Sequence, residues 1–133
     1  MSARTQYAIR AMVHLAMREG HTATAAEISA AEHIPAKYLE GIMSRLKLSA
    51  LVDSERGKNG GYRLAGRPED ISMLAVIEAM DGSVRPVSCL GSQTNCSATA
   101  AGPSCLPKKF WGGLKEAIDA YLGSKTIRDV VEG

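Results

Sequence analysis

The stretch SERGKNGGYRLA, residues 54–65, sets two short polar runs on either side of a glycine-rich turn. Its Asn-Gly step tolerates the positive φ angles that tight hairpin turns require. Three cations lie within these twelve residues. The stretch therefore predicts a basic, two-stranded β-hairpin that projects into solvent.

The residues before the hairpin carry helical patterns. Apolar residues recur at helical spacing over residues 4–18, in a short helix that begins after Thr24, and over residues 36–48. Thr24 and Glu27 match the capping box that starts many helices. Only a few residues separate the second helix from the third, which makes the pair a helix-turn-helix candidate. A helix-turn-helix followed at once by a basic hairpin indicates a winged helix.

The third of these helices is interrupted by Gly41, which costs about 1 kcal/mol relative to alanine in mid-helix. Its small size is therefore expected to allow a neighbouring segment or a partner molecule to approach the helix backbone closely. The predicted buried stripe of this helix consists of Leu39, Ile42, Met43, Leu46 and Leu48.

Two more helices are predicted, one over residues 72–80 and a long one that begins at residue 107. The apolar side of the long helix is formed by Phe110, Leu114, Ala117, Ile118, Tyr121 and Leu122. This side either packs into the chain's own core or forms a two-fold dimer. We favour the dimer, because the hairpin and an irregular loop separate this helix from the N-terminal helices.

Charge is distributed unevenly along the 133 residues. Seven cations against three acids give residues 36–67 a net charge of +4, whereas the whole chain carries +2. A local basic region on a near-neutral chain is typical of proteins that bind a polyanion, although a solvated mixed-charge surface would look alike.

Several classes of protein are disfavoured by the sequence. No apolar run approaches the ~20 residues that a membrane-spanning helix needs, and the N-terminal residues do not resemble a signal peptide. We therefore expect a cytoplasmic protein with no membrane partner. No glycine-rich phosphate loop and no nucleophile paired with a base is recognisable, so an enzyme is not expected.

Three cysteines lie close together, at Cys89, Cys96 and Cys105. Their odd number disfavours a structural disulfide framework. Their spacing matches neither a ferredoxin nor a paired zinc motif. From spacing alone, free thiols and a metal site both stay open.

Four segments together resemble the Rrf2 family of bacterial transcription regulators: RTQYAIRAM at 4–12, residues 26–65, ISMLAVIEAMDG at 71–82, and the cysteine-bearing loop before Phe110. The resemblance implies a mostly α-helical fold with a small β-hairpin wing, that is, a winged helix-turn-helix plus a long C-terminal dimerisation helix. The regions expected are a winged helix-turn-helix DNA-binding region at 1–67, a connecting helix at 68–82, a cysteine-bearing sensor loop at 83–106, and the dimerisation helix with a C-terminal turn at 107–133.

Binding to a double-stranded DNA operator as a homodimer is implied as well. The helix over 36–48 is expected to enter the major groove N-terminal end first. Glu40 corresponds to a glutamate that tunes operator choice in the family, and Arg56 to an arginine that enters the minor groove. Residues expected at the DNA are Arg4, Thr5, Lys37, Tyr38, Glu40, Gly41, Arg45, Arg56, Lys58, Asn59 and Gly60.

Family members with three cysteines in this loop commonly hold an iron–sulfur cluster. Cys89, Cys96 and Cys105 are therefore the expected ligands of a two-iron–two-sulfur or a four-iron–four-sulfur cluster, through which the protein would sense iron, redox state or nitric oxide. Lys108 and Gln6 occupy the usual places of a fourth ligand, and neither suits that role. His14, His33, a carboxylate of the other subunit or a small molecule stay open. The alternative is a cluster-free regulator that switches by thiol oxidation or through a partner enzyme or small molecule.

Overall fold

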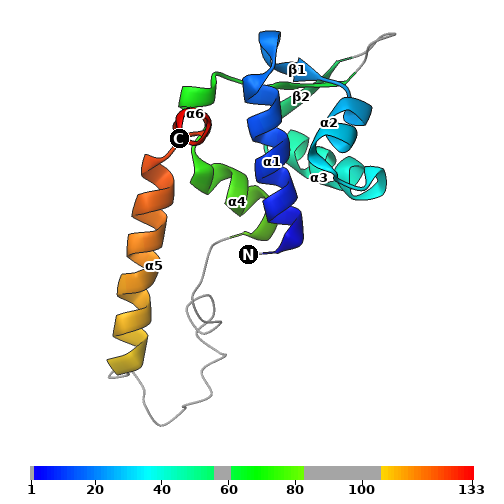
Figure 1. Ribbon diagram of the computed structural model, residues 1–133. Helices are drawn as coiled ribbons and strands as arrows, with labels where there is room; N and C mark the ends of the chain where they lie inside the picture. Colours follow the sequence, from blue (N-terminus) through cyan, green and yellow to red (C-terminus); the bar gives the residue numbers. More distant parts are fainter. Residues whose placement is uncertain (1, 56–60, 83–105) are drawn as a thin grey trace.

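The structure is a computed structural model that describes residues 2–55, 61–82 and 106–133. Five helices and a small sheet form a compact head, and a sixth, long helix projects from it (Figure 1). The helices are α1 (Ala3–Met17), α2 (Ala25–Glu32), α3 (Ala36–Leu48), α4 (Met73–Asp81), α5 (Leu106–Ser124) and α6 (Ile127–Glu132). Single 3₁₀ turns, η1 (Glu19–His21) and η2 (Pro68–Asp70), follow α1 and precede α4. The predicted helices are thus present.

Local capping accounts for where several helices begin. Thr24 and Glu27 form the predicted capping box at the start of α2, with each side chain bonded to the other residue's backbone N–H. The Ser72 hydroxyl accepts from the N–H of Ala75 at the start of α4. Thr126 and Asp129 make a second capping box at α6. These polar contacts are short-range, which is why the sequence alone predicts them.

The sheet has one strand more than the sequence predicts. Strands β2 (Val52–Glu55) and β3 (Gly61–Leu64) form the expected antiparallel hairpin. The two-residue strand β1 (Thr22–Ala23) pairs with the other edge of β3, so the strand order is β1-β3-β2. The wing is therefore attached to the segment between α1 and α2.

The core lies where α1, α3 and α4 meet, with α6 packed on α1. Ala8, Met12 and Leu15 of α1 are fully buried there, as is Ile127 of α6. Burial of this apolar surface is the main favourable contribution to folding. The C-terminal helix therefore belongs to the same core as the N-terminal helices.

A short backbone joint holds the end of α5 to the start of α4. The N–H of Met73 donates to the carbonyl of Lys125 at 2.8 Å, and the N–H of Ile127 donates to the carbonyl of Ile71 at 2.9 Å. Ser72 and Thr126 face each other in the antiparallel bridge between these bonds. The C-terminal end of α5 thus meets the head beside the point where α4 begins.

Candidate nucleic-acid interface

Helix α3 has one buried face and one open face. Leu39, Ile42, Met43 and Leu46 are buried in the core. With 3.6 residues per turn, the positions farthest from them recur at i, i+4, i+7 and i+11. These outward positions, which we call the outer row of α3, are Lys37, Gly41, Ser44 and Leu48, and all four are exposed.

Leu48 corrects the prediction of a five-member buried stripe. It is 85% exposed. Residues i and i+2 of an α-helix point in directions about 200° apart around the helix axis, so Leu48 cannot share a face with Leu46. Ser44, by contrast, was not predicted at the interface, although its spacing from Lys37 and Gly41 places it in the same exposed row.

Gly41 has no neighbour in the described part of the chain that requires a glycine. A methyl group at this position would meet no heavy atom of a described residue within 4 Å. The fold therefore does not explain why a residue with low helix propensity stands here. Close approach of the α3 backbone to a partner outside the chain would explain it.

The charged side chains around the outer row also lack an ionic partner among the described residues. Within residues 2–55, 61–82 and 106–133, Lys37, Glu40 and Arg45 are exposed and take part in no ion pair. Tyr38 is 56% exposed, and its ring lies 6.5 Å from that of Tyr7 on α1. This pair of rings connects the N-terminal half of α3 to the first turns of α1.

The first turn of α1 is only partly as predicted. Arg4 is exposed, and no described carboxylate pairs with it. Thr5, which was expected at the DNA, is wholly buried, so its side chain is not exposed to a partner. Its N–H donates to the Ser2 hydroxyl at 3.2 Å, which is a capping role. Arg10, which was not among the residues expected at the DNA, is exposed and likewise takes part in no ion pair among the described residues.

Asp81, the last residue of α4, holds the start of α1. Its carboxylate accepts from the Ser2 hydroxyl at 2.7 Å and from the Ser2 N–H at 3.1 Å. Burial raises the pKa of Asp81, but hydrogen bonds from the Ser2 and Thr5 side chains and the Ser2 backbone lower it more, so this pKa lies below its ordinary value. Figure 1 shows the N-terminus beside this end of α4.

The base of the wing is ordered by contacts on both sides. Arg63 of β3 lies 3.6 Å from Glu55 of β2, and Lys47 of α3 donates to the Ser54 hydroxyl at 2.8 Å. The predicted tip residues Arg56, Lys58, Asn59 and Gly60 lie outside the described residues.

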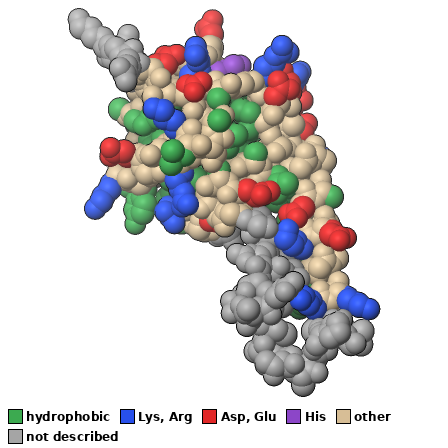
Figure 2. All heavy atoms as spheres, turned by 180° about the vertical axis from the view of Figure 1, so that it is seen from behind, with side chains coloured by type: hydrophobic (Ala, Val, Ile, Leu, Met, Phe, Trp, Pro, Cys, Tyr) green, Lys and Arg blue, Asp and Glu red, His purple; other side chains and the backbone are tan. Residues whose placement is uncertain are grey.

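The basic character of the head is local rather than general. Figure 2 shows lysines and arginines interspersed with acids over the rear face instead of one continuous basic surface. Several other arginines are partnered: Arg18 by Glu27, and Arg67 and Arg128 by Glu69. The cations without a described acidic partner on the head lie mainly on α1 and α3.

One exposed side of α5 carries no charged residue. Leu122 of the predicted stripe instead packs against the core, and Ile118 is half-buried. The outward positions within about 60° of Ala117 form what we call the uncharged face of α5. Its members are Phe110, Gly113, Leu114, Ala117, Ala120, Tyr121 and Ser124, and each is exposed.

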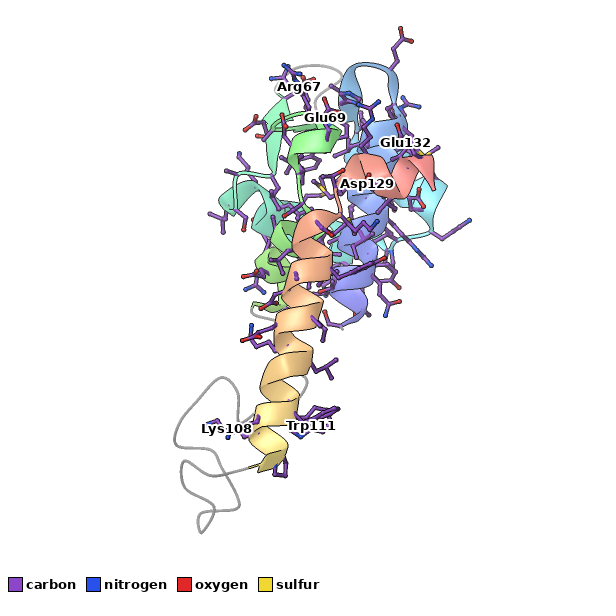
Figure 3. The ribbon with its side chains drawn as sticks, turned by 90° about the vertical axis from the view of Figure 1, so that its left-hand side faces the viewer. Arg67, Glu69, Lys108, Trp111, Asp129 and Glu132 are labelled. Carbon is purple, nitrogen blue, oxygen red and sulfur yellow. The ribbon has the colours of Figure 1, made fainter. Side chains whose placement is uncertain are left out.

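The predicted metal ligands Cys89, Cys96 and Cys105 also lie outside the described residues. Within the described ranges, no three His, Cys, Asp or Glu side chains converge on a site for a metal ion. His14 is engaged with Glu32, with 3.5 Å between Nδ1 and Oε1. Figure 3 shows Lys108 and Trp111 near the N-terminal end of α5, far from α6.

None of the described helices is long and apolar enough to cross a membrane.

A helix-turn-helix joined to a small antiparallel wing, with uncommitted cations on the outward helix, defines a winged-helix DNA-binding protein. Comparison with known proteins gives the family. A family model described as Rrf2, iron-dependent transcriptional regulator, matches residues 1–133. The chain belongs to the Rrf2 family.

Individual relatives agree with this assignment. The transcriptional regulator IscR of Serratia proteamaculans is 35% identical over 133 residues, which cover 98% of this chain and 78% of that protein. The structure of CymR, the global cysteine regulator of B. subtilis, matches with a TM-score of 0.78 and 25% identity over 99% of this chain and 95% of that one. The structure of T. potens IscR matches with a TM-score of 0.75 and 28% identity over 99% and 85%. The predicted winged-helix fold is confirmed, and the chain is a transcriptional regulator and not an enzyme.

Proposed function

We propose that the chain binds a double-stranded DNA operator as a homodimer, with the outer row of α3 in the major groove and the wing beside it. The observation that carries this proposal is that Lys37, Gly41 and Ser44 form an exposed row that makes no side-chain hydrogen bond or ion pair with the described residues. Arg4, Arg10 and Arg45 would contact phosphates, which position the protein, and Lys37, Tyr38, Glu40 and Ser44 would face base edges. By sequence, Arg56, Lys58, Asn59 and Gly60 would follow the minor groove.

DNA binding is tested by selecting from a randomised duplex library with the full chain and measuring the affinity of the recovered duplex by fluorescence anisotropy. Lys37→Ala and Arg56→Ala should each weaken binding about tenfold, as expected for loss of a charge-assisted hydrogen bond. Arg128→Ala, on α6, is the matched control and should leave affinity unchanged. Failure of the wild-type chain to enrich any duplex at low salt would refute the proposal.

The uncharged face of α5 supports a homodimer. Its middle positions Gly113, Ala117 and Ala120 are small, and none of the described residues requires Gly113, since a methyl group there would meet none of their heavy atoms within 4 Å. Phe110 and Tyr121 are exposed by 64% and 62% at its two ends. Two copies of α5 packed by this face would approach closely and bury both aromatic rings, as a two-fold interface allows.

The dimer is tested by placing a charge on this face. Ala117→Glu should convert the dimer to a monomer in sedimentation equilibrium, because pairing would bury two unpartnered carboxylates. Lys108→Glu puts the same carboxylate on the opposite side of α5 and should leave the dimer intact. A wild-type chain that sediments as a monomer at micromolar concentration would contradict the homodimer.

We further propose that Cys89, Cys96 and Cys105 hold an iron–sulfur cluster, of the two-iron–two-sulfur or four-iron–four-sulfur type, as thiolates. Soft thiolate ligands suit such clusters, and the family resemblance and the IscR relatives support this. When bound, the cluster would supply redox and ligand-exchange chemistry, and hence a response to iron, redox state or nitric oxide. The protein would act in the cytoplasm, where its operator is.

The cluster is tested by anaerobic purification. Visible absorption together with bound iron and acid-labile sulfide, all lost in a Cys89→Ala, Cys96→Ala, Cys105→Ala variant, is the expected result. A colourless protein without iron, whose DNA affinity changes with peroxide, would overturn the cluster and favour thiol switching.

A further inference from the structure

The contact between Ser2 and Asp81 is unusual within the described parts of the chain. Its two hydrogen bonds join residues 79 positions apart. Every other side-chain hydrogen bond among the described residues spans nine positions or fewer. These two bonds therefore make the main polar link between the start of α1 and the end of α4, and we call it the Ser2–Asp81 link.

The link fixes both the backbone and the side chain of the N-cap residue. Asp81 takes the Ser2 hydroxyl hydrogen, which leaves the hydroxyl oxygen to accept from the Thr5 N–H at 3.2 Å. A carboxylate at this place also interacts favourably with the positive end of the α1 macrodipole. Arg4 lies inside this capped turn, between Ser2 and Thr5, so the link determines where the Arg4 backbone sits.

The capped turn is also adjacent to the DNA-facing helix. Tyr7, one turn after Arg4 on α1, has its ring 6.5 Å from that of Tyr38 on α3. Arg4 is exposed and has no described acidic partner. A cation held at a fixed distance from a groove-binding helix can contact a phosphate without first becoming ordered, and less conformational entropy is then lost on binding.

We infer that Asp81 is a positioning residue for DNA binding: through Ser2 it holds the first turn of α1 so that Arg4 contacts a phosphate while α3 occupies the major groove. This inference rests on the proposed function. It assigns a role in DNA binding to a residue at the far end of α4, which itself touches no nucleic acid.

The test compares variants that weaken the link with and without a change in charge. Ser2→Ala removes the hydroxyl and its bond to Asp81, keeps the bond from the backbone N–H, and leaves the net charge unchanged. Asp81→Asn removes the carboxylate, and Glu78→Gln, at an exposed position on the same helix, removes one negative charge and spares the link. The affinity for the selected duplex is measured at several salt concentrations, because the slope of log affinity against log salt counts phosphate contacts and does not respond to stability alone.

Ser2→Ala and Asp81→Asn should each lower the slope by about 1 and the affinity about three- to tenfold, whereas Glu78→Gln should keep the wild-type slope. Arg4→Ala should show the same loss, and adding it to Ser2→Ala should cost nothing more, since one contact is lost in either case. Thermal melting of Ser2→Ala checks that the free protein remains folded.

Wild-type slopes in Ser2→Ala and Asp81→Asn, or a full additional effect of Arg4→Ala in the Ser2→Ala background, would overturn the inference and leave the proposed function standing. A wild-type chain that binds no duplex would overturn the proposed function itself.

Discussion

Gly61 is a residue at which the backbone of another strand leaves no room for a side chain. A methyl group here would collide with the carbonyl oxygen of Ala23 and lie 2.7 Å from the Cα of Thr24. Both neighbours are backbone atoms, so they cannot move aside without separating β1 from β3. Gly61 is therefore required by the close pairing of β1 with β3, and not only by the turn that precedes it.

Gly61→Ala should lower the free energy of unfolding by about 1–3 kcal/mol, the usual range for an overpacked site. Urea denaturation measures this. Gly66→Ala is the control, because a methyl group at Gly66 meets nothing within 4 Å, and it should be nearly neutral. Equal stability of the two variants would contradict the close pairing of β1 and β3.

Gly41 presents the opposite situation, in which the space around the glycine is empty. Gly41→Ala should raise the free energy of unfolding by up to about 1 kcal/mol through better helix propensity. The same change should weaken binding to the selected duplex, because the added methyl group stands between α3 and the bases. Thermal melting and anisotropy measure the two effects. Stabilisation with undiminished affinity would show that α3 does not approach DNA at this position.

Residues were predictable from sequence where short-range chemistry determines them. The Thr24 capping box follows from a spacing of three residues, and it is present as predicted. The burial of Thr5 could not be predicted, because it depends on α4 packing beside α1 far along the chain. The predicted burial of Leu48 was wrong for a different reason. Leu48 was placed in the buried stripe because it is apolar, without regard to its angle around the helix axis.

At the scale of elements, α1 and α4 are connected by a carboxylate whose protonation changes the strength of the contact. The pKa of Asp81 is lowered in the folded chain, so the unfolded chain binds the proton more readily. The stabilisation from this contact is therefore fully present above the unfolded pKa of about 3.9 and is lost as the pH falls through the folded pKa.

Asp81→Asn should accordingly be less stable than the wild type at pH 7, and the difference should shrink as the pH is lowered below about 4. Urea denaturation of both proteins over an acidic pH series tests this. Glu78→Gln serves as the control for the lost charge. A stability difference that stays constant down to the lowest pH at which both chains fold would contradict the role assigned to this carboxylate.

The helices were predictable as elements because each carries a periodic apolar pattern over two or more turns. Strand β1 was not, because a run of two residues has no period. Thr22 and Ala23 form a strand only because β3 presents an unpaired edge to them. The element that fixes the wing to the head is thus defined by tertiary structure alone.

At the scale of the whole molecule, the C-terminal helix completes a core that the N-terminal helices begin. Ile127 is fully buried although it lies beyond the long projecting helix. Ile127 lies in a short segment of mixed charge, and this sequence context does not predict that its side chain is buried. The candidate DNA-facing helix was predictable, whereas its support from the other end of the chain was not.

Ile127→Ala should lower the free energy of unfolding by about 2–5 kcal/mol, as for other large-to-small changes in a core. Val131→Ala, on the same helix at an exposed position, should cost far less. Chemical denaturation followed by circular dichroism measures both. Similar small effects of the two changes would mean that α6 is not part of the core.

The hydrogen bond between Met73 and Lys125 holds the C-terminal end of α5 to the head, so any tilt of α5 pivots about this end. Nineteen residues of helix extend about 28 Å, so a tilt of ten degrees at the joint would carry the opposite tip about 5 Å sideways. A base pair rises only about 3.4 Å along the duplex. In the proposed dimer, a tilt of this size would therefore be magnified into a mismatch of a whole base-pair step between the two DNA-binding heads.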